Sequence, residues 1–368
     1  MSATALLALA DENRSALGRR QKLAWLSLVG LAVLLAGALI ASAMLGAVQI
    51  SAAQVLAILG NALGLADASH FTPMQSAVLL DIRLPRLLLA VLVGAGMALA
   101  GAAMQGMFRN PLADPGIVGV SSGAALGAVL WIVLAGQFGF MQAFNQALGV
   151  YALPASAFIG GLLATLVIYR IARFGQPEAQ TFMLLMAGIA IAALTGAATG
   201  VLTYIADDQQ LRSITFWSMG SLGGAGWDNL RVMAVIMLPT MVVLYGLYRL
   251  LDVLLLGEAV AGHLGFEMKH ARPLLIVLVA LLVGVAVSMT GIIGFIGLMA
   301  PHIARLIVGP GHRLMMPAAA LVGALLLVVG DMTARTIAAP AEIPIGIITA
   351  LVGGPFFLVL LFSRRLHA

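Results

Sequence analysis

The residues of this chain that are most able to do chemistry are few, and their spacing argues against catalysis. The 368-residue chain has no cysteine, which excludes disulfides and thiolate metal sites. Its six histidines show no HExxH motif or other metal-ligand spacing, and no GxxxxGK[ST] loop is present to hold ATP phosphates. The sequence therefore predicts no catalytic site, no metal site and no nucleotide site of this kind.

A charged segment at residues 255–272 is the first candidate for an interaction. Its core, from Gly257 to Gly265, reads GEAVAGHLG; it is compatible with a helix and polar enough to leave the lipid. Gly265 suits a helix C-terminus, and Pro273 then suits the first turn of the next helix. The segment is either an ordinary loop or a short helix that presses on a cytoplasmic partner.

Two other segments predict breaks between helices. Residues 109–116 read RNPLADPG, whose prolines and glycine fix a tight turn. Residues 291–297 read GIIGFIG and precede PHIAR at 301–305. Irregular backbone at membrane depth is tolerated only where it is buried in protein or lines a cavity. This break favours a transporter or channel, with structural helix packing as the alternative.

The elements that position these segments are membrane spans. Hydrophobic residues make up 62% of the chain and charged residues 9%, against about 25% charged residues in soluble domains. We expect an all-α integral membrane protein with about ten transmembrane helices, a tail at residues 1–22 and a single membrane domain at 23–365. The first apolar run is longer than a signal-peptide core, so we expect it to remain as an uncleaved span. Charge-poor runs fall at 23–48, 86–107, 116–136, 152–172, 182–204, 231–254, 273–290, 296–309, 316–332 and 344–363.

The distribution of basic residues gives a topology. With the basic N-terminus inside and ten spans, fourteen of the 19 Lys and Arg residues lie inside. The five outside are Arg83, Arg86, Arg212, Arg231 and Arg335. This bias obeys the positive-inside rule, so both termini are expected in the cytoplasm. The net charge of +5 reflects topology rather than nucleic-acid binding.

Two predicted spans carry a small residue at every fourth position. Such stripes allow helix backbones to approach closely in lipid, and they either pack helices or also form a pathway wall. The stripes are Gly94, Ala98, Ala102 and Gly106, and Gly188, Ala192, Gly196 and Gly200.

Six motifs, in their order and spacing over residues 50–365, resemble a known family. They are IRLPR at 82–86, NPLA at 110–113, FWSMGS at 216–221, GFIG at 294–297 before PHIAR, Asp331 and Arg335 with EIPIG at 342–346, and GPFF at 354–357. The chain resembles the permeases of bacterial ABC importers for iron-siderophore, haem and vitamin B12 (the FecCD type). The DDQQLR segment at 207–212 is most similar to the haem-importing subgroup.

The resemblance implies a type II ABC importer permease in the bacterial inner membrane. It implies a homodimer with the pathway between its copies, two cytoplasmic ATPase subunits that bind ATP and Mg²⁺, and a periplasmic binding protein. Cargo moves by alternating access, and this chain holds no permanent cofactor and is not itself an enzyme. The expected cargo is haem or another iron chelate, with siderophore or cobalamin as the alternative.

The resemblance also implies roles for individual residues. It assigns Arg83, Arg86 and Arg335 to docking of the binding protein, and Asn110, Leu112 and Thr181 to a cytoplasmic gate. The coupling helix, which fits the ATPase, comprises Glu258, Ala259, Gly262, Leu264 and Gly265. The pathway is expected along Gly188, Tyr204, Arg212 and Met219, with packing or loop roles as the alternative.

Two rival functions fit the sequence less well. An ion-coupled transporter would favour an acidic residue deep in a span, whereas Asp331 and Glu342 lie near predicted span ends. An intramembrane enzyme would need paired acids or metal ligands at one membrane depth, and the sequence has none.

Overall fold

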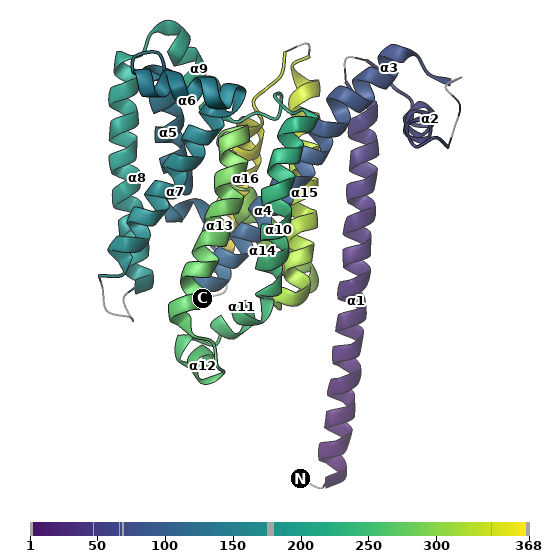
Figure 1. The fold of residues 1–368 in the computed structure, drawn as a ribbon. Helices are drawn as coiled ribbons and strands as arrows, with labels where there is room; N and C mark the ends of the chain where they lie inside the picture. The colour runs from purple at the N-terminus through teal and green to yellow at the C-terminus, as the bar shows by residue number, and fades with distance from the viewer. Residues whose placement is uncertain are drawn as a thin grey trace.

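The computed structural model of the chain describes residues 3–46, 48–65, 67, 70–174, 180–339 and 341–365, without the side chains of 3–20, 181, 361 and 363–365. All regular elements in these ranges are helices (Figure 1). The main helices are α1 (Ala3–Met44), α2 (Ala52–Ala62), α3 (Pro73–Ala77), α4 (Leu84–Met107), α5 (Val120–Leu134), α6 (Gly139–Leu148), α7 (Ala152–Ala172), α8 (Gln180–Ile205), α9 (Asp208–Met219), α10 (Trp227–Gly246), α11 (Tyr248–Leu254), α12 (Glu258–His263), α13 (Met268–Thr290), α14 (Ile296–Val308), α15 (His312–Ile337) and α16 (Ile345–Arg365). Three short helices of other types complete them. They are the π-helix η2 (Val78–Arg83) and the 3-10 helices η3 (Pro115–Val118) and η4 (Gly149–Tyr151).

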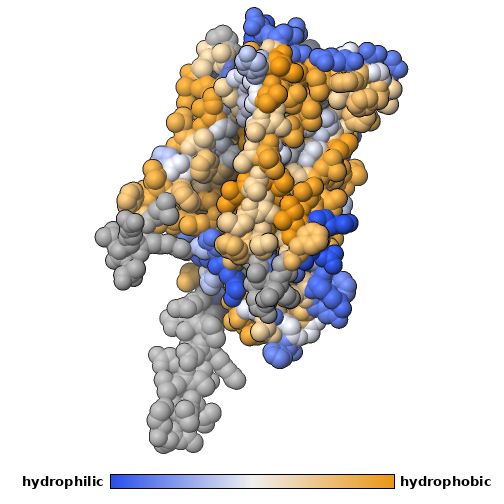
Figure 2. All heavy atoms as spheres, turned by 90° about the vertical axis from the view of Figure 1, so that its left-hand side faces the viewer, coloured by the Kyte–Doolittle hydropathy of each residue, from blue (hydrophilic) through white to orange (hydrophobic). Residues whose placement is uncertain are grey.

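The predicted spans agree with the helices. Seven helical segments of the described chain are long and apolar enough to cross a membrane. The shorter apolar helices α5, α14 and α16 cover the three remaining runs. The predicted all-α membrane fold, with short extra helices, is confirmed. Hydrophobic residues form a band around the middle of the molecule, and hydrophilic residues gather at its two ends (Figure 2).

Helix α4 is the centre of the bundle and is buried along almost its whole length. It contacts α10, α13, α14 and α15. A methyl group on Gly94 would lie 2.4 Å from the carbonyl oxygen of Gly323 in α15, and one on Gly101 would lie 1.7 Å from that of Gly297 in α14. The first predicted stripe therefore does allow close backbone approach, which stabilises helix association in lipid.

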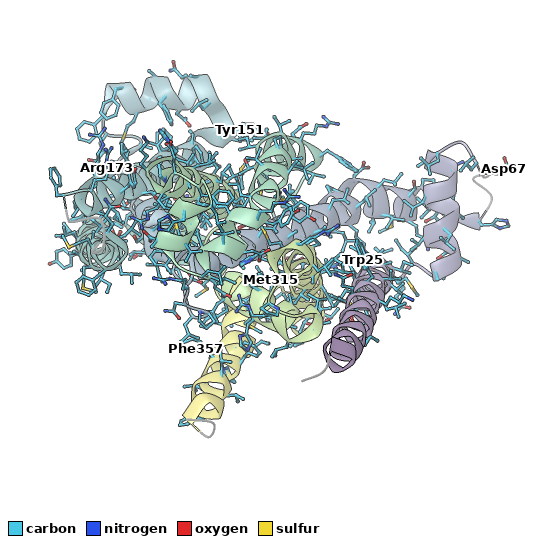
Figure 3. All side chains as sticks on the ribbon, turned by 90° about the horizontal axis from the view of Figure 1, so that it is seen from below. Trp25, Asp67, Tyr151, Arg173, Met315 and Phe357 are labelled. Atoms are coloured by element: carbon cyan, nitrogen blue, oxygen red, sulfur yellow. The ribbon has the colours of Figure 1, made fainter. Side chains whose placement is uncertain are left out.

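The periphery is looser than the centre. Seen from the α12 end, Met315 lies among the central helices, whereas Trp25 on α1 and Phe357 on α16 lie at the edges of the bundle (Figure 3). Met315 is fully buried, but Trp25 is 57% exposed. A chain that exposes so much apolar surface on outer helices requires lipid or further protein around it.

The predicted break before α14 is present, and its backbone geometry explains the glycines. Gly291 ends α13 with φ 72°, and Phe295 precedes α14 with φ 67°. A methyl group on Gly291 would lie 2.1 Å from the carbonyl oxygen of Trp217, so only glycine fits there. The break is packed against α9 rather than open.

Three predicted boundaries differ from the structure. Pro273 lies inside α13 rather than in its first turn, because that helix begins at Met268. The run 231–254 is broken at Leu247 into α10 and α11. The outer segment with FWSMGS is mostly helical, since Asp207 and Gln210 form a capping box that starts α9.

Candidate functional site

The predicted site residues gather at opposite ends of the bundle. Helix α12 projects at one end, while α3, α6 and α9 lie at the other (Figure 1). Three of the five arginines predicted to lie outside, Arg83, Arg86 and Arg335, belong to the second end, through η2, α4 and the last turn of α15. This separation agrees with the charge threading.

Helix α12 is a short helix with a well-defined end. Gly265 adopts φ 89°, and its N–H donates to Gly262 over 3.1 Å, while the N–H of Phe266 donates to Ala261 over 3.0 Å. These two bonds form a Schellman motif, which ends a helix sharply at glycine. The predicted glycine C-terminus is therefore present at Gly265.

The coupling residues form one accessible surface. Ala259, Gly262, Leu264 and Gly265 are exposed, and the side chain of Leu264 is 60% exposed. Glu258 differs because it is half-buried and points back to the bundle. The segment thus offers small and apolar residues outward and one acid inward.

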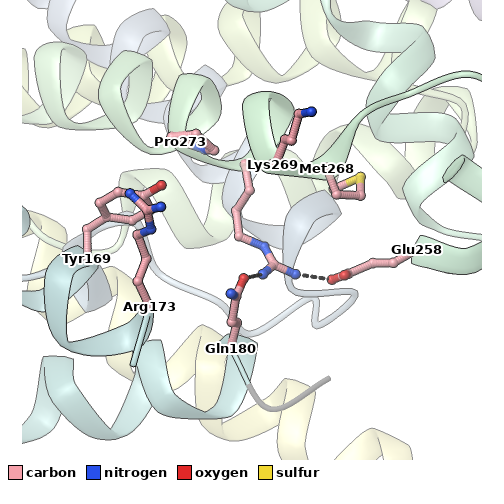
Figure 4. A pocket seen from close by; sticks show the side chains of 8 residues that line it. Tyr169, Arg173, Gln180, Glu258, Met268, Lys269 and Pro273 are labelled. Carbon is pink, nitrogen blue, oxygen red and sulfur yellow. Dashed lines mark hydrogen bonds and ion pairs between the residues drawn. The ribbon is translucent and has the colours of Figure 1, made fainter. Parts of the chain in front are cut away.

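Glu258 belongs to a charged cavity of about 280 Å³ at the base of α12 (Figure 4). Arg272 of α13 donates a hydrogen bond from one terminal guanidinium nitrogen to the carboxylate of Glu258. Its other terminal nitrogen donates a hydrogen bond to the side-chain oxygen of Gln180. Arg173, whose guanidinium lies 6.0 Å from the ring centre of Tyr169, forms part of the opposite wall. One arginine therefore joins α12, α13 and the start of α8.

Arg83 donates hydrogen bonds to the backbone at the C-terminal end of α1. Its guanidinium donates to the carbonyl oxygens of Ala43 at 2.5 Å, of Met44 at 3.2 Å and of Val48. The last carbonyls of a helix lack partners within the helix, so a buried guanidinium is a suitable donor for them. Arg83 is only 4% exposed.

Arg86 and Arg335 share a buried carboxylate. Arg86 Nη2 lies 2.8 Å from Asp331 Oδ1 and 2.9 Å from Glu342 Oε2, and Arg335 Nε lies 3.0 Å from Asp331 Oδ2. Arg335 also donates to the hydroxyl of Ser42 at 2.7 Å. We refer to Arg83, Arg86, Arg335, Asp331 and Glu342 as the arginine cluster.

The three arginines expected to dock the binding protein are mostly buried within the arginine cluster. The side chains of Arg86 and Arg335 are each 10% exposed, whereas that of Glu342 is 47% exposed. Buried cations need paired anions or carbonyls, which the chain itself supplies here. A hollow of about 270 Å³, lined in part by all three arginines and Glu342, still connects the cluster to the surface.

The predicted gate residues lie on a turn against α8. The side-chain oxygen of Asn110 accepts from the N–H of Leu112 at 3.0 Å and so holds the turn after α4. The following η3 helix contacts α8. Thr181 lies in the first turn of α8, but its side chain is outside the described residues.

Asp114 caps η3 within the same turn. Its carboxylate accepts from the N–H of Gly116 at 2.7 Å. Burial raises the pKa of this carboxyl above its ordinary value, and the hydrogen bond from Gly116 only partly offsets that effect. The turn therefore holds a carboxylate in surroundings that disfavour its charge.

The predicted pathway residues divide into two groups. Tyr204 is 90% exposed, Arg212 is exposed and Met219 is half-buried. Gly188 instead faces the protein interior, since a methyl group there would lie 2.3 Å from the carbonyl oxygen of Ile117.

The rest of the second small-residue stripe is open. Ala192, Gly196 and Gly200 are exposed, and a methyl group on Gly196 or Gly200 would meet no atom of the described chain within 4 Å. Large apolar side chains of the same helix are also exposed, with Ile189 at 64%, Leu194 at 66% and Val201 at 64% exposure. Helix α8 thus presents an apolar face built for close approach.

Two glycines allow the end of α9 to approach its neighbours closely. A methyl group on Gly220 would lie 2.5 Å from the carbonyl oxygen of Ile292, and one on Gly346 would lie 2.2 Å from that of Met219. The glycines of the FWSMGS and EIPIG motifs therefore let α9, the end of α13 and α16 meet at the backbone.

Comparison with known proteins identifies the family. Residues 33–363 match the model of the FecCD transport family. The chain belongs to that family. It is 49% identical over 286 residues to the hemin transport system permease protein HmuU of Yersinia pestis, covering 78% of this chain and 83% of the relative. It is 38% identical over 311 residues to the vitamin B12 import system permease protein BtuC of Vibrio cholerae, covering 84% and 90%.

A solved structure of an inward-facing, metal-chelate-type ABC transporter is similar in fold. The TM-score is 0.77 at 35% identity, covering 91% of this chain and 98% of the other. The chain is accordingly a multi-pass importer permease of the FecCD family, a kind of subunit that is not itself an ATPase.

Sequence reasoning missed several partners in this FecCD permease. It named Asp331 and Glu342 as motif positions near span ends without a partner, and it gave Arg272 and Gln180 no role. The available signal was charge, because an acid and a base within apolar surroundings each require a partner. The sequence did not say which residues pair, since Arg86 and Asp331 are 245 positions apart.

Proposed function

We propose that this permease moves haem, or a closely related iron chelate, from the periplasm to the cytoplasm as part of an ATP-driven importer. The choice of haem as the cargo rests on the 49% identity to a hemin transport permease. Cobalamin is the second candidate, because vitamin B12 permeases are 37–38% identical to nearly the whole chain. Siderophore is a further candidate, and the uptake experiment described below distinguishes it from haem.

The energy comes from two ATPase subunits that bind at the α12 end, the cytoplasmic side. The exposed residues of α12 support this docking, because a short helix with small outward residues can enter a groove on a partner. Its Schellman end stabilises the helix, so a push on α12 would be passed on rather than absorbed by unwinding. The partner subunits hold ATP and Mg²⁺.

The working unit is a homodimer in the inner membrane, with the pathway between the two copies. The open stripe of Ala192, Gly196 and Gly200 supports this arrangement, since small residues favour close helix contact in lipid. Tyr204 and Arg212 lie at the periplasmic end of this face, where an arginine suits a haem propionate and a tyrosine ring suits the macrocycle. Met219 is the last residue of α9, where it approaches Gly346 of α16.

A periplasmic binding protein docks at the opposite end from α12. The arginine cluster has three guanidinium groups against two carboxylates, so its net charge is positive. An acidic side chain of the binding protein would enter the hollow and compete with the half-exposed Glu342 for Arg86. This differs from docking on free arginines, because the chain already supplies a weak substitute ligand.

Alternating access follows from these parts. ATP binding brings the ATPase subunits together and displaces α12. The displacement reaches the turn with Asn110 and Leu112 and the start of α8 at Thr181, which together close or open the cytoplasmic side. The membrane subunits do no covalent chemistry, and cargo is held by exposed groups that release it.

The decisive experiment is uptake by vesicles that contain the permease, the ATPase and the binding protein. We expect accumulation of haem that requires ATP and is lost in Glu258→Lys, which reverses the charge at the base of α12. Uptake of cobalamin in place of haem would identify cobalamin as the cargo. Uptake that needs no ATP and follows a proton gradient would overturn the mechanism.

A further inference from the structure

Arg272 is placed to connect the ATPase-facing helix to the gate. It lies in the second turn of α13, and the residue is 8% exposed. One of its terminal nitrogens donates to Glu258 of α12 and the other to Gln180, the first residue of α8 (Figure 4). The next residue of α8 is Thr181, which carries the proposed gate.

The connection has the rigidity that transmission requires. A guanidinium is planar and stays charged, so two acceptors on its two terminal nitrogens are held in a fixed relative direction. A lysine would offer a single point charge on a flexible stem and could not hold both acceptors in the same way. The link is therefore specific to arginine.

The surrounding charges make the link costly to break. The described side chains that line the cavity include three cations, Arg173, Lys269 and Arg272, but Glu258 is their one carboxylate. If α12 moved away alone, it would leave the buried Arg272 among like charges without its counter-ion. An unpaired buried charge is strongly unfavourable, so α12 and α13 move together.

Gln180, the uncharged partner of Arg272, extends the link to α8. Gln180 contributes an amide oxygen to a charged donor, a hydrogen bond that is stronger than one between neutral groups. Helix α8 in turn contacts η3, which follows the Asn110 turn. A shift of the start of α8 therefore carries Thr181 with it and changes its position relative to the Asn110 turn.

We propose that Arg272 is a positioning residue that transmits the displacement of α12 to the start of α8 and so couples ATP hydrolysis to gate movement. This inference rests on the proposed function, in which α12 receives the motion of the ATPase. It assigns the coupling to the bridge from Glu258 through Arg272 to Gln180.

The test compares cargo transported per ATP hydrolysed in vesicles of the complete transporter. Arg272→Met keeps an unbranched stem of about the length of the aliphatic part of arginine and removes the charged guanidinium, and Gln180→Ala removes only the link to α8. The matched control is Arg173→Met, since Arg173 lines the same cavity from its opposite wall and, among the hydrogen bonds of the described residues, is bonded to neither Glu258 nor Gln180. Co-purification with the ATPase and the rate of hydrolysis are measured for each variant.

We expect Arg272→Met and Gln180→Ala to keep the ATPase bound and hydrolysing, while cargo per ATP falls about tenfold. Arg272→Lys should recover only part of this loss, and Arg173→Met should resemble the wild type. If Arg272→Met does not fold, Gln180→Ala decides alone. A wild-type ratio in Gln180→Ala, or loss of the ATPase from every Arg272 variant, would overturn the inference. Failure of the wild type to couple uptake to ATP would instead overturn the proposed function.

Discussion

Arg86 and Asp331 meet in the interior of the protein with 2.8 Å between Nη2 and Oδ1, although 245 residues separate them in the chain. Asp331 is fully buried and also binds Arg335. The pair joins the start of α4 to the last turns of α15. The pair therefore stabilises the packing of α4 against α15, independently of any docking of the binding protein beside it.

Asp331→Asn should destabilise the permease strongly. The substitution leaves two buried guanidinium groups without their shared counter-ion, a change that costs about 3–5 kcal/mol. Asp228→Asn is the matched control, because Asp228 forms an ion pair with Arg231 in which both side chains are more than 70% exposed. Thermal unfolding in detergent should show a large fall in midpoint for the first variant and little for the second. Equal effects would contradict a structural role for the pair.

Glu342→Gln should strengthen docking of the binding protein. It removes the half-exposed carboxylate that competes for Arg86 and keeps the shape of the side chain. We expect the affinity of the purified permease for the binding protein to rise about twofold to fivefold, the range of an exposed ion pair. The effect should shrink at high salt. A fall in affinity would mean that Glu342 itself contacts the partner.

The membrane fold could be predicted from the sequence because it depends on local composition. Each span is an apolar run of its own, and the glycine end of α12 at Gly265 is a local backbone requirement. The close approach of α4 to α15 at Gly94 also followed from the spacing of small residues. These features need no knowledge of which helices are neighbours.

The candidate site was less predictable because its geometry is set by distant partners. The sequence predicted that Arg83 and Arg86 lie on the opposite side from the 255–272 segment, but it could not show that carbonyls of α1 and the carboxylate of Asp331 would surround them. The neighbour of Gly188 was unpredictable for the same reason, since the face of α8 that it occupies is covered by Ile117 in η3. Residue type predicted the need for a partner, but only the fold supplies its identity.

Gly101→Ala should disrupt the contact between α4 and α14. The added methyl group would lie 1.7 Å from a backbone oxygen, so one of the two helices must shift. Overpacking of this kind costs about 1–3 kcal/mol. Gly30→Ala on α1 is the control, because a methyl group there meets nothing within 4 Å. That variant should be neutral or more stable, since alanine favours helix over glycine. A stable Gly101→Ala would contradict the close approach.

Gly196→Leu should separate the two copies without harming the single chain. The new side chain finds open space within the described chain, but it would fill the face proposed for the second copy. Light scattering of the detergent-solubilised protein should show monomers in place of dimers, with an unchanged helical circular dichroism spectrum. Gly30→Leu, on the outer helix α1, is the matched control and should stay dimeric. Dimers of Gly196→Leu would place the interface elsewhere.

Asp114→Asn should stabilise the protein in a pH-dependent manner. The pKa of the native carboxyl is raised by burial, so ionisation is less favourable in the folded chain than in the unfolded chain. The wild type consequently loses stability as the pH rises from the ordinary value of 3.8 through the higher native pKa. Asparagine does not titrate, and its side-chain oxygen can still accept from Gly116. The difference in unfolding midpoint should therefore be small near pH 4 and grow in favour of Asn as the pH rises to about 7. A difference that stays constant with pH, or that favours the wild type at neutral pH, would show that the hydrogen bond to Gly116 outweighs burial.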